Sequence, residues 1–405
     1  MKYIIVLGDG MADLPIDELG GKTPLAYAET KNMDYLSTMS EIGMVHTIPD
    51  GMKPGSDTAN LSVIGYDPKV YYSGRSPLEA LSIGVPMKDT DIALRCNIVT
   101  ISEETDIPFE QRTIIDHSSD EISTQDCAIL LEAVRKELEN DIYKFYVGTS
   151  YRHCLIWDQG QVVELTPPHD VLGRVIQPYL PEDEILYEMM KKSYDILSVH
   201  PLNEQRRQKG LRPANCCWFW GAGTKPLLDD FASLHHKKGV MISAVDLLKG
   251  IAVGAGMDNI EVEGANGGLH TNYEGKAQAA VKALTEDGYD FVYVHVEAPD
   301  EMGHQGSVEK KVKAIENIDT RVIKVIMDKM AAAGEDYRML ILPDHPTPIC
   351  VRTHTSDDVP YMLYDSTKTL KNSGEGGLYC EEAAAKTGIK VAKGHELILK
   401  LFAEN

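Results

Sequence analysis

The sequence predicts an α/β protein in which helices cover both faces of a mostly parallel sheet. Short apolar runs have the length of strands, and segments with helical periodicity lie between several of them. The runs are residues 2–7, 217–220, 240–243, 291–296, 339–342 and 359–363. Two of the helical patterns cover residues 276–284 and 308–333. Strands that alternate with helices in this way are typical of open α/β sheets.

The middle of the chain departs from this alternation. It holds several alternating segments, two proline-rich loops and an acidic amphipathic helix near residues 125–138. We therefore expect a discontinuous core made of residues 1–95 and 206–405, with residues 96–205 inserted as a separate α+β domain. A chain of 405 residues is long enough for such an arrangement.

Composition and charge exclude several classes of protein. The chain carries 40 Lys and Arg against 62 Asp and Glu, a net charge of −22. Such an acidic chain repels phosphate backbones and anionic lipids, so nucleic acid and membrane surfaces are poor partners. No apolar run approaches the roughly 18 residues of a membrane-spanning helix, and the first run ends at Gly8, too early for a secretory signal. The seven scattered cysteines fit a reducing compartment, so we expect a cytoplasmic protein.

Two of the apolar runs are followed directly by residues that bind metal ions in many proteins. Open α/β sheets bind their ligands at the carboxyl ends of the strands, so these positions bear on function. Asp9 follows the first run, although an Asp beside glycines also suits a simple turn. Asp300 and His304 follow the run at 291–296, four residues apart. On a helix this spacing places both side chains on one face, as a shared metal ion requires.

Two further segments complete the pattern. Asp344 and His345 follow the run at 339–342, and His354 comes soon after them. Ser56 lies in the motif Pro-Gly-Ser-Asp-Thr-Ala-Asn, directly before a short apolar helical run. The free N–H groups of a helix N-terminus favour a bound phosphoryl group, although a serine there is also a common helix cap.

These residues divide into two balanced sets of metal ligands. The sets are Asp300, His304 and His354, and Asp9, Asp344 and His345 with the Ser56 oxygen. Two metal ions about 4 Å apart stabilise both the attacking and the leaving oxygen in phosphoryl transfer. A metal-bound serine has a lowered pKa and becomes a nucleophile at neutral pH. We therefore expect two divalent ions, which these ligands allow to be Mn²⁺, Zn²⁺, Mg²⁺ or Co²⁺.

Longer segments around the same residues point to a family. They are LGDGMAD, PGSDTANLSVIGYDP, SGRSPLEA, EAPDEMGH and the Asp-His…His segment that ends at His354. With them, nearly the whole chain resembles the archaeal type of cofactor-independent phosphoglycerate mutase, of the alkaline phosphatase superfamily. The resemblance implies an alkaline-phosphatase-like core with an inserted substrate-binding domain, and the division of metal ligands given above. It also implies that Ser56 takes up the phosphoryl group.

Five cationic residues could bind a phosphoglycerate in such an enzyme. They are Arg95, Arg152, His153, Arg212 and Lys225. Arginine matches carboxylate and phosphate oxygens with its planar fork, and lysine supplies a point charge. We expect His153 to move a proton to or from the substrate hydroxyl and Lys225 to assist catalysis as well as binding. The alternative is that each arginine pairs with a nearby acid.

We therefore expect a metal-dependent phosphoglycerate mutase, an isomerase of glycolysis. It would interconvert 3-phosphoglycerate and 2-phosphoglycerate through a phosphoserine, with a small phosphorylated metabolite as its partner. Two alternatives stay open. The segment LTPPHD at residues 165–170 is closer to a branch of the superfamily proposed to act as homoserine kinase. A metal-dependent phosphomonoesterase would use the same ligands, and the sequence predicts no oligomeric state.

Overall fold

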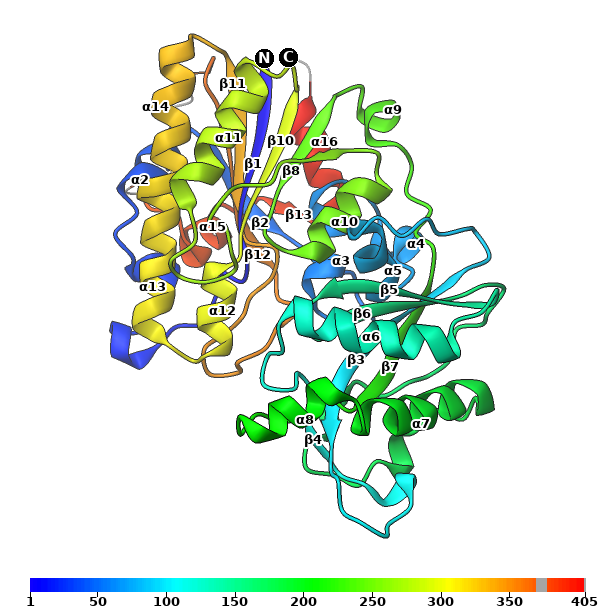
Figure 1. The fold of residues 1–405 in the computed structure, drawn as a ribbon. Helices are drawn as coiled ribbons and strands as arrows, with labels where there is room; N and C mark the ends of the chain where they lie inside the picture. The colour runs from blue at the N-terminus through cyan, green and yellow to red at the C-terminus, as the bar shows by residue number, and fades with distance from the viewer. Residues whose placement is uncertain (369–376, 404–405) are drawn as a thin grey trace. The chain divides into compact units, whose positions relative to one another are not determined.

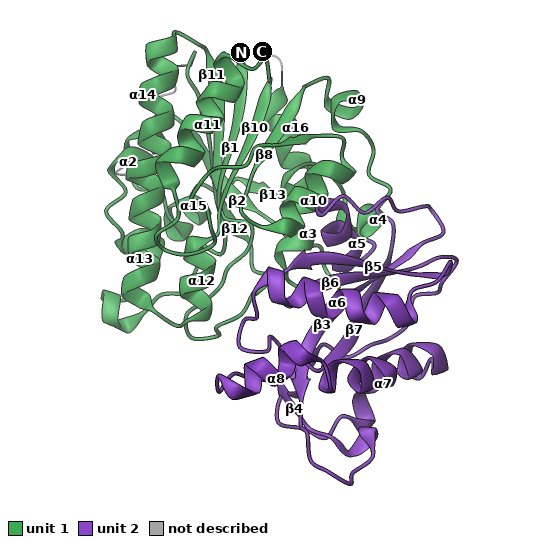
Figure 2. Cartoon of the chain, in the orientation of Figure 1, with its two compact units in different colours: residues 1–72, 227–405 green, residues 73–226 purple. Residues whose placement is uncertain are grey.

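The computed structural model describes residues 1–368 and 377–403, which divide into two compact units (Figure 2). Unit 1 consists of Met1–Tyr72 and Leu227–Asn405, and unit 2 of Ser73–Pro226. The expected insertion at residues 96–205 lies inside unit 2, but the boundaries differ. A boundary after residue 95 would cut strand β3 (Ile92–Ile101), which pairs with β7 (Cys216–Thr224) along most of its length. Both strands therefore belong to unit 2.

Unit 1 is built on a mostly parallel sheet with the strand order β13-β2-β12-β11-β1-β10-β8-β9 (Figure 1). The strands β11, β1, β10, β8 and β9 run parallel, while β12 runs antiparallel to β11 and to β2. The strands are β1 (Lys2–Gly8), β2 (Glu41–Val45), β8 (Gly239–Ile242), β9 (Asp258–Asn259), β10 (Phe291–Val296), β11 (Tyr337–Leu342), β12 (Val359–Asp365) and β13 (Lys390–Val391). The predicted α/β fold with a mostly parallel sheet is confirmed in this unit.

Helices cover both faces of this sheet, because its central strands are buried on both sides. On one face Ile4 and Val6 of β1 pack in a buried cluster with α2, α11, α13 and α14. On the other face Tyr3 packs edge-on against Phe402 of α16, with ring centroids 5.0 Å apart. The helices are α1 (Pro24–Tyr27), α2 (Lys31–Ser37), α3 (Ser56–Val63), α4 (Pro68–Tyr71), α9 (Phe231–His235), α10 (Asp246–Gly254), α11 (Tyr273–Thr285), α12 (Ala298–His304), α13 (Val308–Asn317), α14 (Lys324–Ala333), α15 (Glu381–Lys386) and α16 (Leu397–Phe402).

Unit 2 has a sheet of its own, in which the strand pairings of the described residues are antiparallel. β3 pairs with β6 (Arg152–Trp157) and β7, its far end pairs with β4 (Ile114–Asp116), and β5 (Tyr143–Thr149) extends the sheet beyond β6. The helices α6 (Thr124–Leu138) and α7 (Glu184–Ser198) pack on one face and form its main apolar core. The remaining helices are α5 (Arg75–Ser82) and α8 (Pro201–Gln208).

Strand β7 corrects one expectation about the core. The apolar run at residues 217–220 was expected to join the parallel sheet, because it falls within the range 206–405. It instead forms part of β7 and pairs antiparallel with β3 in unit 2. A short apolar run does not reveal which strand it will pair with, so the sequence could not assign it to a sheet.

Two further observations concern the described residues as a whole. None of their helices combines the length and the apolar character needed to cross a membrane. All seven cysteines lie in the described segments and are free thiols, six of them buried and Cys350 exposed.

Candidate metal centre

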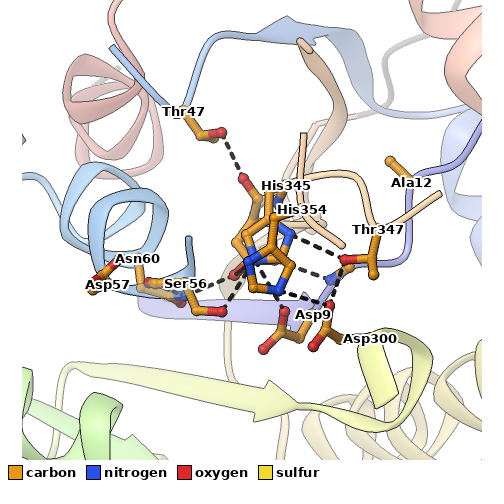
Figure 3. Close-up of polar contacts among 12 residues, drawn as sticks. Asp9, Ala12, Thr47, Ser56, Asp57, Asn60, Asp300, His345, Thr347 and His354 are labelled. Atoms are coloured by element: carbon orange, nitrogen blue, oxygen red, sulfur yellow. Dashed lines mark hydrogen bonds and ion pairs between the residues drawn. The ribbon is translucent and has the colours of Figure 1, made fainter. Parts of the chain in front are cut away.

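Three neighbouring parallel strands end side by side, and each is followed by an aspartate. Asp9 comes directly after β1, Asp344 comes shortly after β11, and Asp300 belongs to α12, which follows β10. All three carboxylates are buried. Figure 3 shows the side chains of Asp9 and Asp300 converging with the rings of His345 and His354. The strand-end acids singled out in the sequence are thus gathered at one place in unit 1.

The first group of candidate ligands is Asp300, His304 and His354. Their ligand atoms lie within 4.8 Å of one another, which is close enough for one metal ion. The four-residue spacing on α12 brings His304 Nε2 to 3.1 Å from one Asp300 oxygen, and His354 Nε2 lies 3.4 Å from the other. The Nδ1 atom of His304 lies 3.0 Å from the carbonyl oxygen of Arg352. Donation of Nδ1–H to that carbonyl leaves the Nε2 lone pair for a metal ion.

The second group is Asp9, Asp300 and His345, whose ligand atoms also lie within 4.8 Å of one another. Ser56 is the first residue of α3, and its Oγ lies 3.1 Å from His345 Nε2. Ser56 is therefore held against the second group, at a helix N-terminus, as the sequence pattern predicted. Asp300 takes part in both groups, a feature that the two separate sets drawn from the sequence did not contain.

Asp344, which the sequence pattern grouped with Asp9 and His345, lies beside the second group but is not one of its three members. Its Oδ2 lies 3.3 Å from His345 Nε2 and accepts a hydrogen bond from Asn60 Nδ2, while its Oδ1 accepts hydrogen bonds from the N–H groups of Gly10 and His345. The carboxylate therefore lies beside the second group while being held by three N–H donors. Asn60 also donates to the carbonyl oxygen of Ser56, so it ties the start of α3 to Asp344.

Gly10 explains why the first strand ends in a Gly-Asp-Gly motif. Its φ is 58°, in the left-handed region that favours glycine. A Cβ atom at this position would lie 2.6 Å from Asp300 Oδ1 and 2.8 Å from Asp300 Cα. Any larger residue would therefore force Asp300 away from the loop that carries Asp9.

The electrostatics of this cluster favour bound cations. Among the described residues, Asp9, Asp300 and Asp344 form ion pairs with histidines and with no lysine or arginine. Burial raises the pKa of Asp9 well above its usual value, and the carboxylates of Asp344 and Asp300 raise it further. The Oδ1 atom of Asp9 is buried and receives no hydrogen bond from the residues that the structure describes. A buried carboxylate oxygen without a donor is costly, and a divalent ion would supply the missing positive charge.

The pKa values of the neighbouring histidines are also shifted by burial and by these carboxylates. The hydrogen bond to Asp300 raises the pKa of His304 to about 9. Burial raises the pKa of Asp300, but the hydrogen bonds from His304 and His354 outweigh this effect and place it well below its usual value. Burial lowers the pKa of His345. Carboxylate, imidazole and hydroxyl groups together fit Mn²⁺, Zn²⁺ and related divalent ions.

The cationic residues expected to bind substrate all lie in unit 2, where three of them are paired with acids. Arg95 makes two hydrogen bonds to Glu79, of 2.6 and 2.7 Å, and its guanidinium lies 4.4 Å from the ring centre of Trp220. Arg212 pairs with Asp116 and Asp120, and Lys225 pairs with Asp89 at 2.8 Å.

Arg152 and His153 are neighbours on β6 and therefore lie on opposite faces of the sheet. His153 is 4% exposed on the face covered by α6, where Nδ1 accepts the Gly148 N–H and Nε2 lies 3.0 Å from Cys127 Sγ. Burial lowers the pKa of His153 to about 4. Arg152 is exposed, contacts the Tyr151 ring at 5.0 Å and has no carboxylate partner among the described residues. Of the two, Arg152 is the residue available to a ligand.

Several residues with a role in these arrangements were not singled out from the sequence. In unit 1 they are His295, Ser243, Asn60 and Thr347, which contact the candidate ligands or one another. His295 had a visible signal, since it is the one charged or strongly polar side chain in the buried run FVYVHV. In unit 2, the rings of Tyr151, His117, His169 and Trp220 follow one another with centroids 5.3 to 6.2 Å apart. No spacing in the sequence marks that row.

Comparison with known proteins adds independent information. Residues 37–203 match a family model described as 2,3-bisphosphoglycerate-independent phosphoglycerate mutase. A protein of that name from Methanosarcina barkeri is 49% identical over 403 residues, with 98% of both chains covered. A probable 2,3-bisphosphoglycerate-independent phosphoglycerate mutase from Geobacter sulfurreducens is 46% identical, again with 98% of both chains covered.

Solved structures show the same similarity. A protein from Pyrococcus horikoshii matches 100% of this chain and 98% of its own, with a TM-score of 0.82 and 30% identity. A cofactor-independent phosphoglycerate mutase from Thermoplasma acidophilum matches 99% of both chains, with a TM-score of 0.66 and 25% identity. Both comparisons cover the two units together, so the similarity extends over the whole fold.

Proposed function

The chain belongs to the family of 2,3-bisphosphoglycerate-independent phosphoglycerate mutases, and from this premise we propose that it interconverts 3-phosphoglycerate and 2-phosphoglycerate through a phosphoserine at Ser56. The proposal rests mainly on one observation. A serine hydroxyl at a helix N-terminus lies 3.1 Å from His345, beside buried acids that have no lysine or arginine partner among the described residues. That is the combination of nucleophile, helix N–H groups and metal ligands that phosphoryl transfer needs.

In the forward reaction the Oγ–P bond forms at Ser56 while the bond between phosphorus and the 3-oxygen of the substrate breaks. The proton of the serine hydroxyl ends on the released 3-hydroxyl group. The bound glycerate then turns so that its 2-hydroxyl attacks the phosphoserine, its proton returns to Ser56, and 2-phosphoglycerate leaves. Exclusion of water matters throughout, because water attacking the phosphoserine would release phosphate.

The residues of unit 1 have distinct parts in this scheme. Two divalent ions, which we propose to be Mn²⁺, Zn²⁺, Mg²⁺ or Co²⁺, would supply positive charge for the transferring phosphoryl group and lower the pKa of the serine. His304 and His354 with Asp300 would hold one ion, and Asp9 and His345 with Asp300 or Asp344 the other. The N–H groups at the start of α3 would bind phosphoryl oxygens.

We propose that unit 2 binds the glycerate part of the substrate and that Arg152 is its main cation. Arg152 is exposed and free of a carboxylate partner among the described residues. Arg95, Arg212 and Lys225 already pair with acids, so they would have to exchange those partners for a ligand. His153 is buried on the helix-covered face, so the proton transfer expected of it is not part of this proposal. The substrate pair is glycolytic, and we propose a cytoplasmic enzyme.

The test is a turnover assay on the purified protein with added Mn²⁺. One arm follows the conversion of 3-phosphoglycerate to 2-phosphoglycerate without 2,3-bisphosphoglycerate. The other arm offers homoserine with ATP. Turnover in the first arm alone is expected, and turnover in the second arm alone would overturn the proposal.

A matched pair of variants tests the role of Ser56. Ser56→Ala should reduce turnover by at least about 10⁴-fold, as loss of a nucleophile does elsewhere. Ser62→Ala is the control, because Ser62 lies on the same helix and its hydroxyl makes no hydrogen bond within the described part of the chain. Incubation with ³²P-labelled 3-phosphoglycerate should label the wild type and the control, while Ser56→Ala stays unlabelled.

A further inference from the structure

A chain of hydrogen bonds ends at Oδ2 of Asp9, the oxygen that is not the one near His345. His295 of β10 is completely buried, and its Nε2 lies 2.9 Å from Asp9 Oδ2. Its Nδ1 lies 3.2 Å from the hydroxyl of Ser243, which follows β8. That hydroxyl accepts the N–H of Val245 at 3.0 Å. These hydrogen bonds therefore connect the backbone that follows β8, through His295 of β10, to the carboxylate that follows β1.

The directions of these hydrogen bonds follow from the groups involved. With a metal ion bound, the Asp9 carboxylate would be ionised and could only accept, so Nε2 of His295 carries the hydrogen that it donates to Asp9. The Ser243 oxygen accepts from Val245, which leaves its own O–H free to donate to Nδ1. Ser243 therefore holds the neutral ring in the tautomer with the hydrogen on Nε2.

The two oxygens of Asp9 are thereby divided between two tasks. Oδ2 is bound to His295, whereas Oδ1 is buried, receives no hydrogen bond from any described residue and lies 3.6 Å from His345 Nε2. We propose that His295 is a positioning residue that holds Asp9 so that Oδ1 faces the metal ion, and that Ser243 fixes the tautomer His295 needs for this. This inference rests on the metal centre of the proposed function.

Two other roles for His295 fit the geometry less well. A metal ligand needs a free lone pair on a ring nitrogen, but Nε2 donates to Asp9 and Nδ1 accepts from Ser243. A purely structural histidine would need no particular partner at Nε2, whereas this one meets a carboxylate that itself belongs to a ligand group. Histidines or carboxylates that orient metal ligands typically change metal affinity 10- to 100-fold when they are replaced.

The experiment compares two substitutions of His295 that differ in which ring nitrogen they imitate. His295→Gln places an amide N–H near the position of Nε2 and can still donate to Asp9. His295→Asn is shorter, places its amide near Nδ1 and cannot reach Asp9. The Mn²⁺ dissociation constant is measured by chelator competition for both variants and the wild type. The expected result is affinity about 10- to 100-fold weaker in His295→Asn and within about threefold of wild type in His295→Gln.

Two further variants test the role of Ser243 and control for the loss of a histidine elsewhere in the protein. Ser243→Ala removes the group that fixes the tautomer and should weaken Mn²⁺ binding by less than His295→Asn does. His235→Gln is the control, because His235 is a half-buried histidine of α9 that packs on Phe231 and Phe402. Its Mn²⁺ affinity should equal that of the wild type. Melting temperatures in EDTA should be alike for the Gln and Asn variants of His295, because both lose the same ring from the core.

The outcomes separate this inference from the proposed function. Equal Mn²⁺ affinities for His295→Gln, His295→Asn and the wild type would overturn the positioning role while leaving the metal centre in place. Equal losses in both variants, with lower melting temperatures in EDTA, would also overturn it, because they would show a structural role only. A wild type that binds no Mn²⁺ would overturn the metal centre of the proposed function and this inference with it.

Discussion

The two units differ in how their charged side chains are paired. In unit 1, Asp9, Asp300 and Asp344 are buried together and meet histidines, but no lysine or arginine among the described residues. In unit 2, Arg95 and Arg212 each pair with acids. At these three aspartates unit 1 therefore carries negative charge that its described lysines and arginines do not balance, while most of the cations considered in unit 2 are already balanced.

This difference distinguishes charged side chains that are available to bind a ligand from charged side chains that stabilise the fold. A buried carboxylate without a cation is destabilising, and a protein keeps such groups where a bound ion compensates them. A paired arginine at the surface contributes little to binding until its partner is displaced. Arg152 is the exception in unit 2, because it is exposed and has no carboxylate partner among the described residues.

The largest expected effect comes from Asp300, the residue shared by both candidate ligand groups. Asp300→Asn removes a charge from both groups at once, so turnover should fall by at least about 10⁴-fold. The bound Mn²⁺ per chain, measured by equilibrium dialysis, should fall at the same time. A variant that keeps both its Mn²⁺ and its turnover would show that the unbalanced charge of unit 1 is not a metal centre.

Glu309→Gln is the control for this change. Glu309 is an exposed acid in the first turn of α13 and belongs to neither ligand group. Its replacement removes the same charge from the same unit, so Mn²⁺ content and turnover should stay at the wild-type level. A loss of Mn²⁺ there would mean that net charge alone governs metal binding.

The next effect concerns the unpaired cation of unit 2. Arg152→Gln should raise the KM for 3-phosphoglycerate about 10- to 100-fold, because a charged hydrogen bond to an anion is worth about 1.5–3 kcal/mol. Mn²⁺ affinity should not change, since no candidate metal ligand lies in unit 2. The measurement is steady-state kinetics beside chelator competition.

Arg95→Gln supplies the contrast within the same sheet. Arg95 is largely buried, hydrogen-bonded to Glu79 and stacked on Trp220. Its loss leaves Glu79 without this partner, so the urea midpoint of unfolding should fall. If Arg95→Gln raised the KM more than Arg152→Gln did, the distinction between paired and unpaired cations would be wrong.

Much of the metal centre could be predicted from the sequence because its residues follow strands directly. The position of Asp9 or Asp344 relative to the sheet is fixed by the apolar run before it, and parallel strands end at a common edge. The helical spacing of Asp300 and His304 likewise depends only on local structure. Local rules sufficed to predict the α/β core and to place these candidate ligands at the ends of its strands.

The remaining features depend on contacts between distant parts of the chain. Nothing local reveals that Arg95 meets Glu79 or that β7 pairs with β3. The face on which His153 lies follows from the register of β6, which a short strand does not disclose. The sharing of Asp300 between two groups depends on where α12 lies relative to β1, which the sequence alone does not fix.

Removal of the metal should affect the two units unequally. An ion present at 100 times its dissociation constant stabilises the folded protein by about 2.7 kcal/mol. EDTA should therefore lower the melting temperature by about 5–10 °C. Hydrogen–deuterium exchange should speed up in the peptides around Asp9, Ser56 and Asp344, and much less in the sheet of unit 2. Equal increases in both units would contradict the assignment of the ions to unit 1.

The last expected effect concerns the acid stability of unit 2. Burial lowers the pKa of His153 to about 4, below its usual value of 6.5. Between these values the unfolded chain binds a proton that the folded protein does not. Stability is therefore lost as the pH falls from about 6.5 to about 4, by up to about 3 kcal/mol.

His153→Asn tests this effect, because asparagine does not titrate and still offers an oxygen to the Gly148 N–H. The urea midpoint is measured at pH 7 and pH 4.5 with EDTA present, so that metal binding in unit 1 does not contribute. The wild type should lose more stability between these pH values than His153→Asn does. Equal losses of stability in the two proteins would contradict this prediction. They would mean that His153 takes up its proton in the folded protein, and that the buried face of the unit 2 sheet accepts the charged ring.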